Sequence, residues 1–370
     1  MIKNLIGKVR KSLQNMLGEA HLSGNAFRRV SVLAAMVSGV LRQGSSRLPD
    51  LARANPDLKQ QASKEKQYKR WLLNDHTAYR IHYLPYVERL LKVLGSANDL
   101  VFSIDGSTAG RGCMVLMLSV IYQNRAIPVV WSVVRAKKGH LPEAMHRQLL
   151  SRLADIAPAN CPITIVGDGE YDGLDWQDDI VSHGWDYVLR TGRAKLAGQD
   201  ADDLLALKWL SPELGQDTFT LTQAYFTQQG YGPVNLTVWH QGRYKQAIYL
   251  LSNLHYAPDI TKCYKKRFKI ETFFSDQKSR GFNLHRSHLK DPERLAKLLI
   301  ATCLAYILCI LAGVQCQQSS HYPFVHRTDR CDLSLFALGR RFLEVLVDLR
   351  QWCRLDFEML TDYGNYKSVR

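Results

Sequence analysis

The chain has 370 residues, of which 46% are hydrophobic and 10% aromatic, and this composition excludes an intrinsically disordered protein. Its formal net charge of +15 favours a polyanionic partner such as nucleic acid. Eight cysteines without a CxxC pair predict reduced, mostly buried thiols, as is typical of a cytoplasmic protein.

Residues 1–95 are predicted to be helical throughout. The first twenty residues lack the apolar core of a signal peptide. Their apolar side chains recur at helical spacing, which predicts an amphipathic helix that packs on its own domain or lies on a membrane surface. Short helices follow, and the last of them carries clustered cations: Lys64, Lys66, Lys69 and Arg70. This pattern is typical of a helix-turn-helix-like DNA-binding domain, or of a packing domain with a solvated basic face.

Strands dominate from residue 96 to residue 192. Five apolar runs predict strands at 100–104, 114–122, 127–134, 163–166 and 185–189, with helices at 141–156 and 174–183. The basic loop before the first of these helices contains Lys137 and Lys138, which are candidates for DNA binding. Three strands, helix, strand, helix, strand is the order of a ribonuclease-H-like fold, an α/β fold whose mixed five-stranded sheet has helices on both faces.

Two carboxylates stand out in this region, because Asp105 and Asp168 each follow a predicted strand and precede a glycine. The first and fourth strands are neighbours in the ribonuclease-H-like order, so both side chains are expected at one edge of the sheet. Either Asp alone is equally well explained as a turn former or helix cap. Glu170 and Asp172 follow closely, and each is an alternative to Asp168 as the second carboxylate of such a site.

Residues 193–255 are too many for an ordinary connection and predict a β-rich insertion, with strands at 219–226, 234–240 and 246–251. Trp209 and Trp239 fall within it. A buried position in the core is one interpretation of each indole, and an exposed ring that stacks on a base is the other.

The stretch 264–278, YKKRFKIETFFSDQK, contains no Pro or Gly and predicts one uninterrupted helix. At about 100° per residue, four side chains lie within an arc of roughly 60° on that helix. They are Tyr264, Arg267, Glu271 and Lys278. This face is either a solvated surface with local ion pairs or part of a site shared with the two upstream carboxylates.

The remainder of the chain predicts helices. His285 and His288 have the spacing of metal ligands but lack a nearby Cys pair for a zinc site. Asp291 is expected to cap a helix that ends near residue 314, long and apolar enough to cross a membrane but predicted to be a buried core helix. Residues 256–314 would complete the catalytic core, and 315–370 would form a helical C-terminal extension without an assigned role.

The spacing Tyr-x2-Arg-x3-Glu-x6-Lys resembles the signature of DDE transposases of bacterial insertion sequences, in insertion sequence family four. The resemblance implies that Asp105, Asp168 and Glu271 bind two Mg²⁺ ions, for which Mn²⁺ substitutes. It implies that Tyr264, Arg267 and Lys278 hold DNA phosphates. It also implies that the insertion covers the DNA end, where an aromatic side chain such as Trp239 or Trp209 holds a flipped base.

Cut-and-paste transposition is the function that this resemblance implies. The expected partners are the terminal inverted repeats of the element and target DNA, bound by a homodimer in the bacterial cytoplasm at the nucleoid, without membrane association. Three alternatives stay open: a nuclease of the same fold without strand transfer, an inactive DNA-binding derivative, and a recombinase with Tyr264 as covalent nucleophile.

Overall fold

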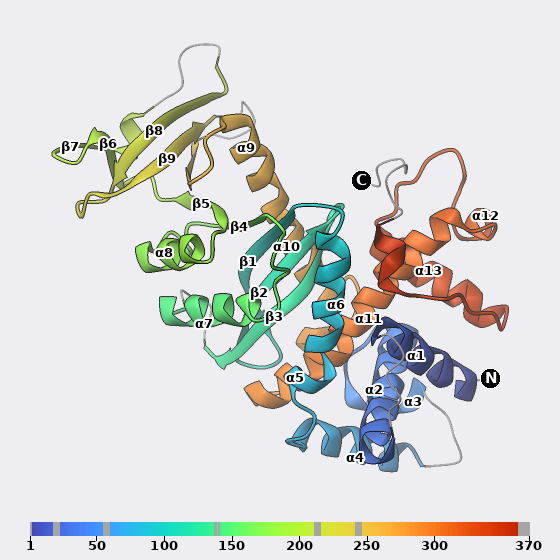
Figure 1. The fold of residues 1–370 in the computed structure, drawn as a ribbon. Coiled ribbons are helices and arrows are strands. Elements are labelled where there is room, and N and C mark those ends of the chain that lie inside the picture. The colour runs from blue at the N-terminus through green and yellow to red at the C-terminus, as the bar shows by residue number, and fades with distance from the viewer. Residues whose placement is uncertain are drawn as a thin grey trace.

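The computed structural model describes residues 2–17, 23–54, 60–136, 139, 141–210, 216–240 and 246–361. They form a mixed α/β structure in which helices cover a large sheet (Figure 1). The regular elements of the described residues before position 96 are all helical, as the spacing of apolar side chains predicts. These helices are α1 (Ile2–Leu17), α2 (Gly24–Gln43), α3 (Leu48–Ala54), α4 (Gln61–Leu73), α5 (Tyr79–His82) and α6 (Leu84–Gly95).

Within the described residues, ten strands form one sheet in the order β3-β2-β1-β4-β5-β10-β9-β8-β6-β7. β1 pairs antiparallel with β2 and parallel with β4, and β4 pairs parallel with β5. The first five strands match the predicted runs, and their bounds are β1 (Leu100–Ala109), β2 (Cys113–Tyr122), β3 (Arg125–Arg135), β4 (Ile163–Gly167) and β5 (Asp186–Thr191).

The prediction of a five-stranded sheet is wrong in extent. β10 (Ile248–Ser252) pairs antiparallel with β5, so the sheet continues into residues 193–255. This pairing covers the edge of β5 that would otherwise be open. The remaining strands are β6 (Leu196–Asp200), β7 (Asp203–Ala206), β8 (Thr218–Phe226) and β9 (Tyr231–Trp239). The sequence does not predict β6 and β7, because both are short, with five and four residues.

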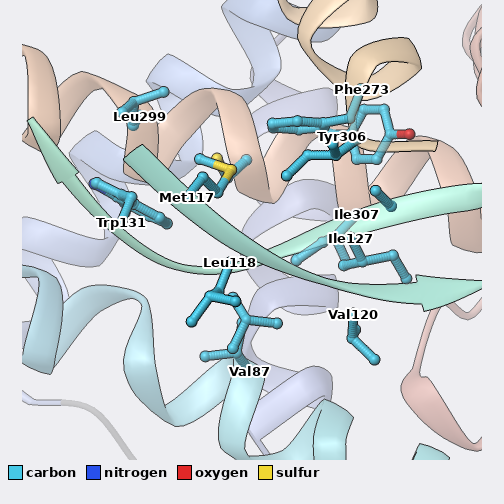
Figure 2. Close-up of a cluster of buried hydrophobic side chains, with 14 of the residues drawn as sticks. Val87, Met117, Leu118, Val120, Ile127, Trp131, Phe273, Leu299, Tyr306 and Ile307 are labelled. Carbon is cyan, nitrogen blue, oxygen red and sulfur yellow. The ribbon is translucent and has the colours of Figure 1, made fainter. Parts of the chain in front are cut away.

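Helices cover both faces of the sheet. Figure 2 shows Leu118 of β2 and Val87 of α6 on one side of the strands, with Phe273 and Tyr306 on the other. These side chains are fully buried or nearly so. The alternation of neighbouring β2 residues between two apolar faces explains why its sequence reads as a continuous apolar run. α7 (Glu143–Ala154) and α8 (Leu174–Ser182) pack against each other beside β3 and β5.

The prediction of one continuous helix over residues 264–278 is wrong. The segment consists of α9 (Ala257–Lys265), the 3₁₀ turn η2 (Lys266–Phe268) and α10 (Lys269–Gln277). The turn lies over the sheet, where the buried hydroxyl of Ser103 donates a hydrogen bond to the carbonyl of Arg267, 3.2 Å away. A tighter turn changes the angular position of the side chains that follow it.

The long helix α11 (Pro292–Gln318) is the centre of the helical part of the molecule. Asp291 caps it, since its carboxylate accepts a hydrogen bond from the amide of Arg294 at 2.8 Å, as predicted. By length and composition α11 is the single membrane-span candidate among the described residues, but 94% of its apolar window is buried inside the protein. It is therefore a core helix, as the sequence predicts.

The C-terminal region packs into the same core. α12 (Tyr322–Val325) and α13 (Leu335–Asp348) both contact α11. The contact with α13 is close, because a Cβ atom at Gly339 would lie 1.8 Å from the carbonyl oxygen of Cys309. The indole of Trp352 donates a hydrogen bond to Ser12 of α1, at 3.1 Å. α1 buries Val9 and its other inward apolar side chains in this assembly, so it packs on its own protein.

Candidate active site

Strand geometry brings Asp105 and Asp168 to the same face of the sheet. Val101 and Ser103 of β1 point toward α9 and η2, and Asp105 has the same parity along the strand. Val166 of β4 also packs against α9, and Asp168 follows it by two residues. Because β1 and β4 are adjacent parallel strands, the two carboxylates lie side by side at the end of their paired segment.

The prediction that Asp105 ends its strand is wrong. β1 continues to Ala109, because the residues after Asp105 still pair with β2, while its pairing with β4 stops at Ser103. Asp168 does follow the end of β4. Its carboxylate accepts a hydrogen bond from the amide of Glu170 at 3.0 Å, which gives it a turn-forming role as well.

Burial, and after it the charge of the Asp168 carboxylate, raises the pKa of the Asp105 carboxyl to about 7. Arg267 and the amide of Gly106 oppose this shift, and Glu271 adds to it. The three predicted carboxylates therefore act on one another electrostatically. A bound cation would offset their mutual repulsion and stabilise the ionised forms.

Arg267 lies between two of the three carboxylates. One of its terminal nitrogens is 2.7 Å from Oε1 of Glu271 and the other is 4.0 Å from Oδ2 of Asp105. The guanidinium is buried against the ring of Phe268, whose centroid is 4.3 Å from its central carbon. Glu271 itself is half-exposed, so its carboxylate is accessible to solvent from the other side.

Tyr264 is buried, and its hydroxyl makes no hydrogen bond of normal geometry within the described residues. Burial raises the pKa of this phenol. A buried hydroxyl with a raised pKa is a poor covalent nucleophile, which disfavours the recombinase alternative. The same burial keeps the hydroxyl away from a DNA phosphate in this conformation.

Lys278 reaches β1 from the end of α10. Its ammonium donates a hydrogen bond of 2.7 Å to the hydroxyl of Ser107, two residues beyond Asp105. The charge is thereby held beside the carboxylates. Sequence spacing identified Lys278 but not Ser107, because only the continuation of β1 past Asp105 brings that hydroxyl to the site.

Glu170 and Asp172 hold neighbouring loops in place. The Glu170 carboxylate accepts a hydrogen bond from the amide of Leu141 at 3.0 Å. Asp172 accepts one from the Thr191 hydroxyl at 2.6 Å, which ties the loop after β4 to the end of β5. Both carboxylates therefore bond to other segments of the chain, whereas the Asp168 carboxylate bonds to the amide of Glu170 in its own loop.

Tyr171, which sequence reasoning missed, lies under the site. It is fully buried, and a Cβ atom at Gly106 would be 3.8 Å from its hydroxyl. Burial raises its pKa, and Asp105, Glu170 and Asp168 raise it further. No motif points to this Tyr, because its position depends on how the loop after β4 folds back onto β1.

The two tryptophans of the predicted insertion, Trp209 and Trp239, have different environments. Trp239 is buried in a small core with Val166, Val188 and Tyr264, and Lys265 covers its ring. Its ring is therefore not available to a base in this conformation. Trp209 is 71% exposed in the 3₁₀ turn η1 (Leu207–Trp209), with the ammonium of Lys208 5.0 Å from the ring centroid.

The remaining DNA-binding candidates fall into two groups. Lys66, Lys69 and Arg70 are exposed on α4, where Lys69 pairs with Glu65 at 2.6 Å. Lys137 and Lys138 lie outside the described residues.

The donor chemistry of the site suits a hard divalent cation, because Asp105, Asp168 and Glu271 offer carboxylate oxygens. Within the described ranges, no group of three or more His, Cys, Asp or Glu side chains is close enough to hold a metal ion, His285 and His288 included. At the carboxylates, Arg267 occupies the position between Asp105 and Glu271. The carboxylates thus fit a cation by chemistry and charge, and Arg267 neutralises part of that charge here.

Known proteins offer two comparisons. The family model described as transposase DDE domain matches residues 69–308, which is more than half of the chain and includes β1, β4 and α10. Among solved structures, the chain is similar to the piggyBac transposase in a cryo-EM structure of its synaptic complex with hairpin DNA. The identity is 11%, covering 92% of this chain and 77% of that chain, with a TM-score of 0.46. No curated protein matches the sequence.

Proposed function

The chain belongs to the transposase DDE domain family, and from this premise we propose that it excises a DNA element and inserts it elsewhere by cut-and-paste transposition. Members of this family act on DNA and generally use divalent metal ions. The observation that carries the proposal is the pair Asp105 and Asp168, which lie where the pairing of the adjacent parallel strands β1 and β4 ends, with Arg267 linking Asp105 to Glu271. The spacing of Tyr264, Arg267, Glu271 and Lys278 supports the narrower assignment to bacterial insertion sequence family four.

The strand order β3-β2-β1-β4-β5 with helices on both faces supports a ribonuclease-H-like catalytic core. In our proposal residues 96–192 and 256–314 form this core, and 193–255 is the insertion. Residues 1–95 form a DNA-binding domain whose exposed cations on α4 contact phosphates. Residues 315–370 contribute to the hydrophobic core through α13.

Asp105, Asp168 and Glu271 would hold Mg²⁺ or Mn²⁺, two ions per site. When bound, these ions activate the attacking oxygen and stabilise the leaving one in an in-line displacement. Burial and the carboxylate neighbours hold the pKa of Asp105 near 7, so this carboxyl must lose a proton before it binds a cation.

Arg267 and Lys278 would bind the phosphates next to the scissile bond. Arg267 already spans two carboxylates, and a DNA phosphate would compete with them for its guanidinium. Transfer of the guanidinium to the phosphate would free Asp105 and Glu271 at the moment that substrate arrives. Lys278, held by Ser107, would neutralise a second phosphate.

Trp209 is the better candidate for stacking on an unpaired base, since it is exposed and Trp239 is not. The substrates in this proposal are the inverted repeats of the element and a target duplex, bound by a homodimer in the bacterial cytoplasm.

The test uses a plasmid that carries the gene with its flanking DNA, incubated with purified protein and Mg²⁺. We expect double-strand cleavage at the element ends and joining of the freed 3′ ends to a second plasmid. Asp168→Asn should abolish both steps, and Glu170→Gln should retain them. Cleavage that survives Asp168→Asn but is lost in Glu170→Gln would refute the assignment of the second carboxylate.

The alternatives predict other products in the same assay. Hydrolysis without joining would indicate a nuclease of this fold. Binding of the element ends without cleavage, at any Mg²⁺ or Mn²⁺ concentration, would indicate an inactive DNA-binding derivative.

A further inference from the structure

The first three strands of the sheet extend beyond the carboxylates. The pairing of β1 with β4 ends at Ser103, but β1 continues to Ala109. At about 3.3 Å per residue, its end lies roughly 13 Å past Asp105. β2 and β3 accompany it, since Cys113 pairs with both Ala109 and Arg135. This projection forms a side of the active site, on the flank opposite to β5 and the insertion.

A second segment fixes the tip of this projection. The amide of Arg111 donates a hydrogen bond of 2.7 Å to the carbonyl of Leu289, and the thiol of Cys113 donates one of 3.3 Å to the carbonyl of Lys290. Gly110 has φ +56°, and a Cβ atom there would lie 2.5 Å from the Leu289 oxygen. The tip and residues 284–290 therefore form one preorganised surface.

Exposed basic side chains cover this surface, which we name the outer basic wall. Its members are Arg111, Arg135, His285, Arg286 and Lys290. Across the described residues, the side chains of its arginines and of Lys290 make neither a hydrogen bond nor an ion pair. The nearby Asp291 is engaged as the cap of α11.

The field at this surface is positive. Burial lowers the pKa of His285, and the charges of Arg286 and Lys278 lower it further. Lys278, which lies in the candidate site, is therefore close enough to act on His285. A hollow beside the wall is lined by Thr108, Gly110, Gly112, Cys113, Arg135 and His285.

We propose that the outer basic wall binds the phosphate backbone of duplex DNA as it leaves the active site. Its cations come from the β1–β2 turn, the end of β3 and the 284–290 segment, so they are spread along the surface and do not converge on one point. Such an arrangement suits an extended polyanion better than a small anion. The proposal rests on the proposed function only in that it takes the polyanion to be DNA.

The test replaces three wall cations together, in Arg111→Ala/Arg135→Ala/Lys290→Ala. The probe is a fluorescent 30-base-pair duplex of random sequence, with EDTA present and the salt concentration varied. Each lost phosphate contact reduces the slope of log K against log salt by about 0.9, so we expect a reduction of about 2.7 and a loss of affinity of up to about 500-fold at 0.1 M salt. All three side chains are exposed, so the melting temperature should not change.

The matched control is Lys92→Ala/Arg330→Ala/Arg354→Ala, which removes three exposed cations that pair with carboxylates elsewhere. It should keep the wild-type slope. A wall variant with the wild-type slope, or a control that loses as much as the wall variant, overturns the proposal. DNA cleavage by the wild type is measured separately. A reduced slope in the wall variant, together with a wild type that cleaves no DNA, would support DNA binding by the wall and refute the proposed transposase activity. An unchanged slope in the wall variant, together with cleavage by the wild type, would refute the wall and support the transposase.

Discussion

Asp105→Asn is expected to stabilise the metal-free protein at pH 8 while it abolishes DNA cleavage. The reason is that Asp105 carries a charge in a largely buried position beside Asp168, and these surroundings raise its pKa to about 7 from a usual value of 3.8. The substitution keeps the shape of the side chain and removes the charge. It also removes an oxygen ligand for the proposed cation.

The magnitude follows from linkage between proton binding and folding. Because the pKa of Asp105 is higher in the folded state, its contribution to stability is fully present below about pH 4 and is lost as the pH rises through 7. One pKa unit corresponds to about 1.4 kcal/mol, so ionised Asp105 costs the folded state about 4 kcal/mol in the absence of metal. Most of this, about 3 kcal/mol, is expected to appear between pH 5 and pH 8.

The assay is urea denaturation of the wild type and Asp105→Asn in EDTA at pH 5 and pH 8. The difference in unfolding free energy between the two proteins should be about 3 kcal/mol larger at pH 8, in favour of the variant. The control, Asp75→Asn, changes an exposed Asp and should show no such difference. Addition of Mg²⁺ at pH 8 should stabilise the wild type and leave Asp105→Asn unchanged.

A difference between the wild type and Asp105→Asn that is the same at both pH values would refute this reasoning. It would mean that the carboxyl is ionised without cost, so the site would already be neutralised by Arg267. Stabilisation of Asp105→Asn by Mg²⁺ to the same extent as the wild type would show that the cation binds elsewhere.

Four further substitutions test the packing of the protein. Gly339→Ala should destabilise the protein by more than 3 kcal/mol in urea denaturation, since its Cβ would collide with a carbonyl of α11, and Gly7→Ala, in open space on α1, should stabilise it by up to about 1 kcal/mol. Arg125→Met should cost about 3–5 kcal/mol at pH 8 because it leaves Asp276 buried without its partner 3.1 Å away, and should cost less at pH 5, since burial already raises the pKa of Asp276 to about 6. Trp239→Ala should lower stability by about 3–5 kcal/mol in the same assay, and a loss of DNA binding without loss of stability would contradict its core position.

Local sequence determined most of the elements that carry the candidate site. The apolar runs of β1 to β5 and the helices between them follow from periodicity, and Asp291 marks the start of α11 correctly. The carboxylates Asp105, Asp168 and Glu271 are also visible in the sequence, through their positions after apolar runs and their spacing. These features depend on neighbours within a few residues, so the sequence displays them directly.

Tertiary structure decided what lies between those elements. The pairing of β10 with β5, which turns a five-stranded sheet into a larger one, joins strands almost sixty residues apart and leaves no local pattern. The turn η2 interrupts a stretch with good helix propensity because the segment must cross the sheet where Ser103 bonds its backbone. Spacing places Arg267 and Lys278 on one helical face, and the sequence leaves Trp239 open as a core residue or an exposed stacking ring. The sheet beneath them buries Arg267 and Trp239 and ties Lys278 to Ser107. Long-range pairing and burial set these outcomes, and they depend on contacts that a single sequence does not show.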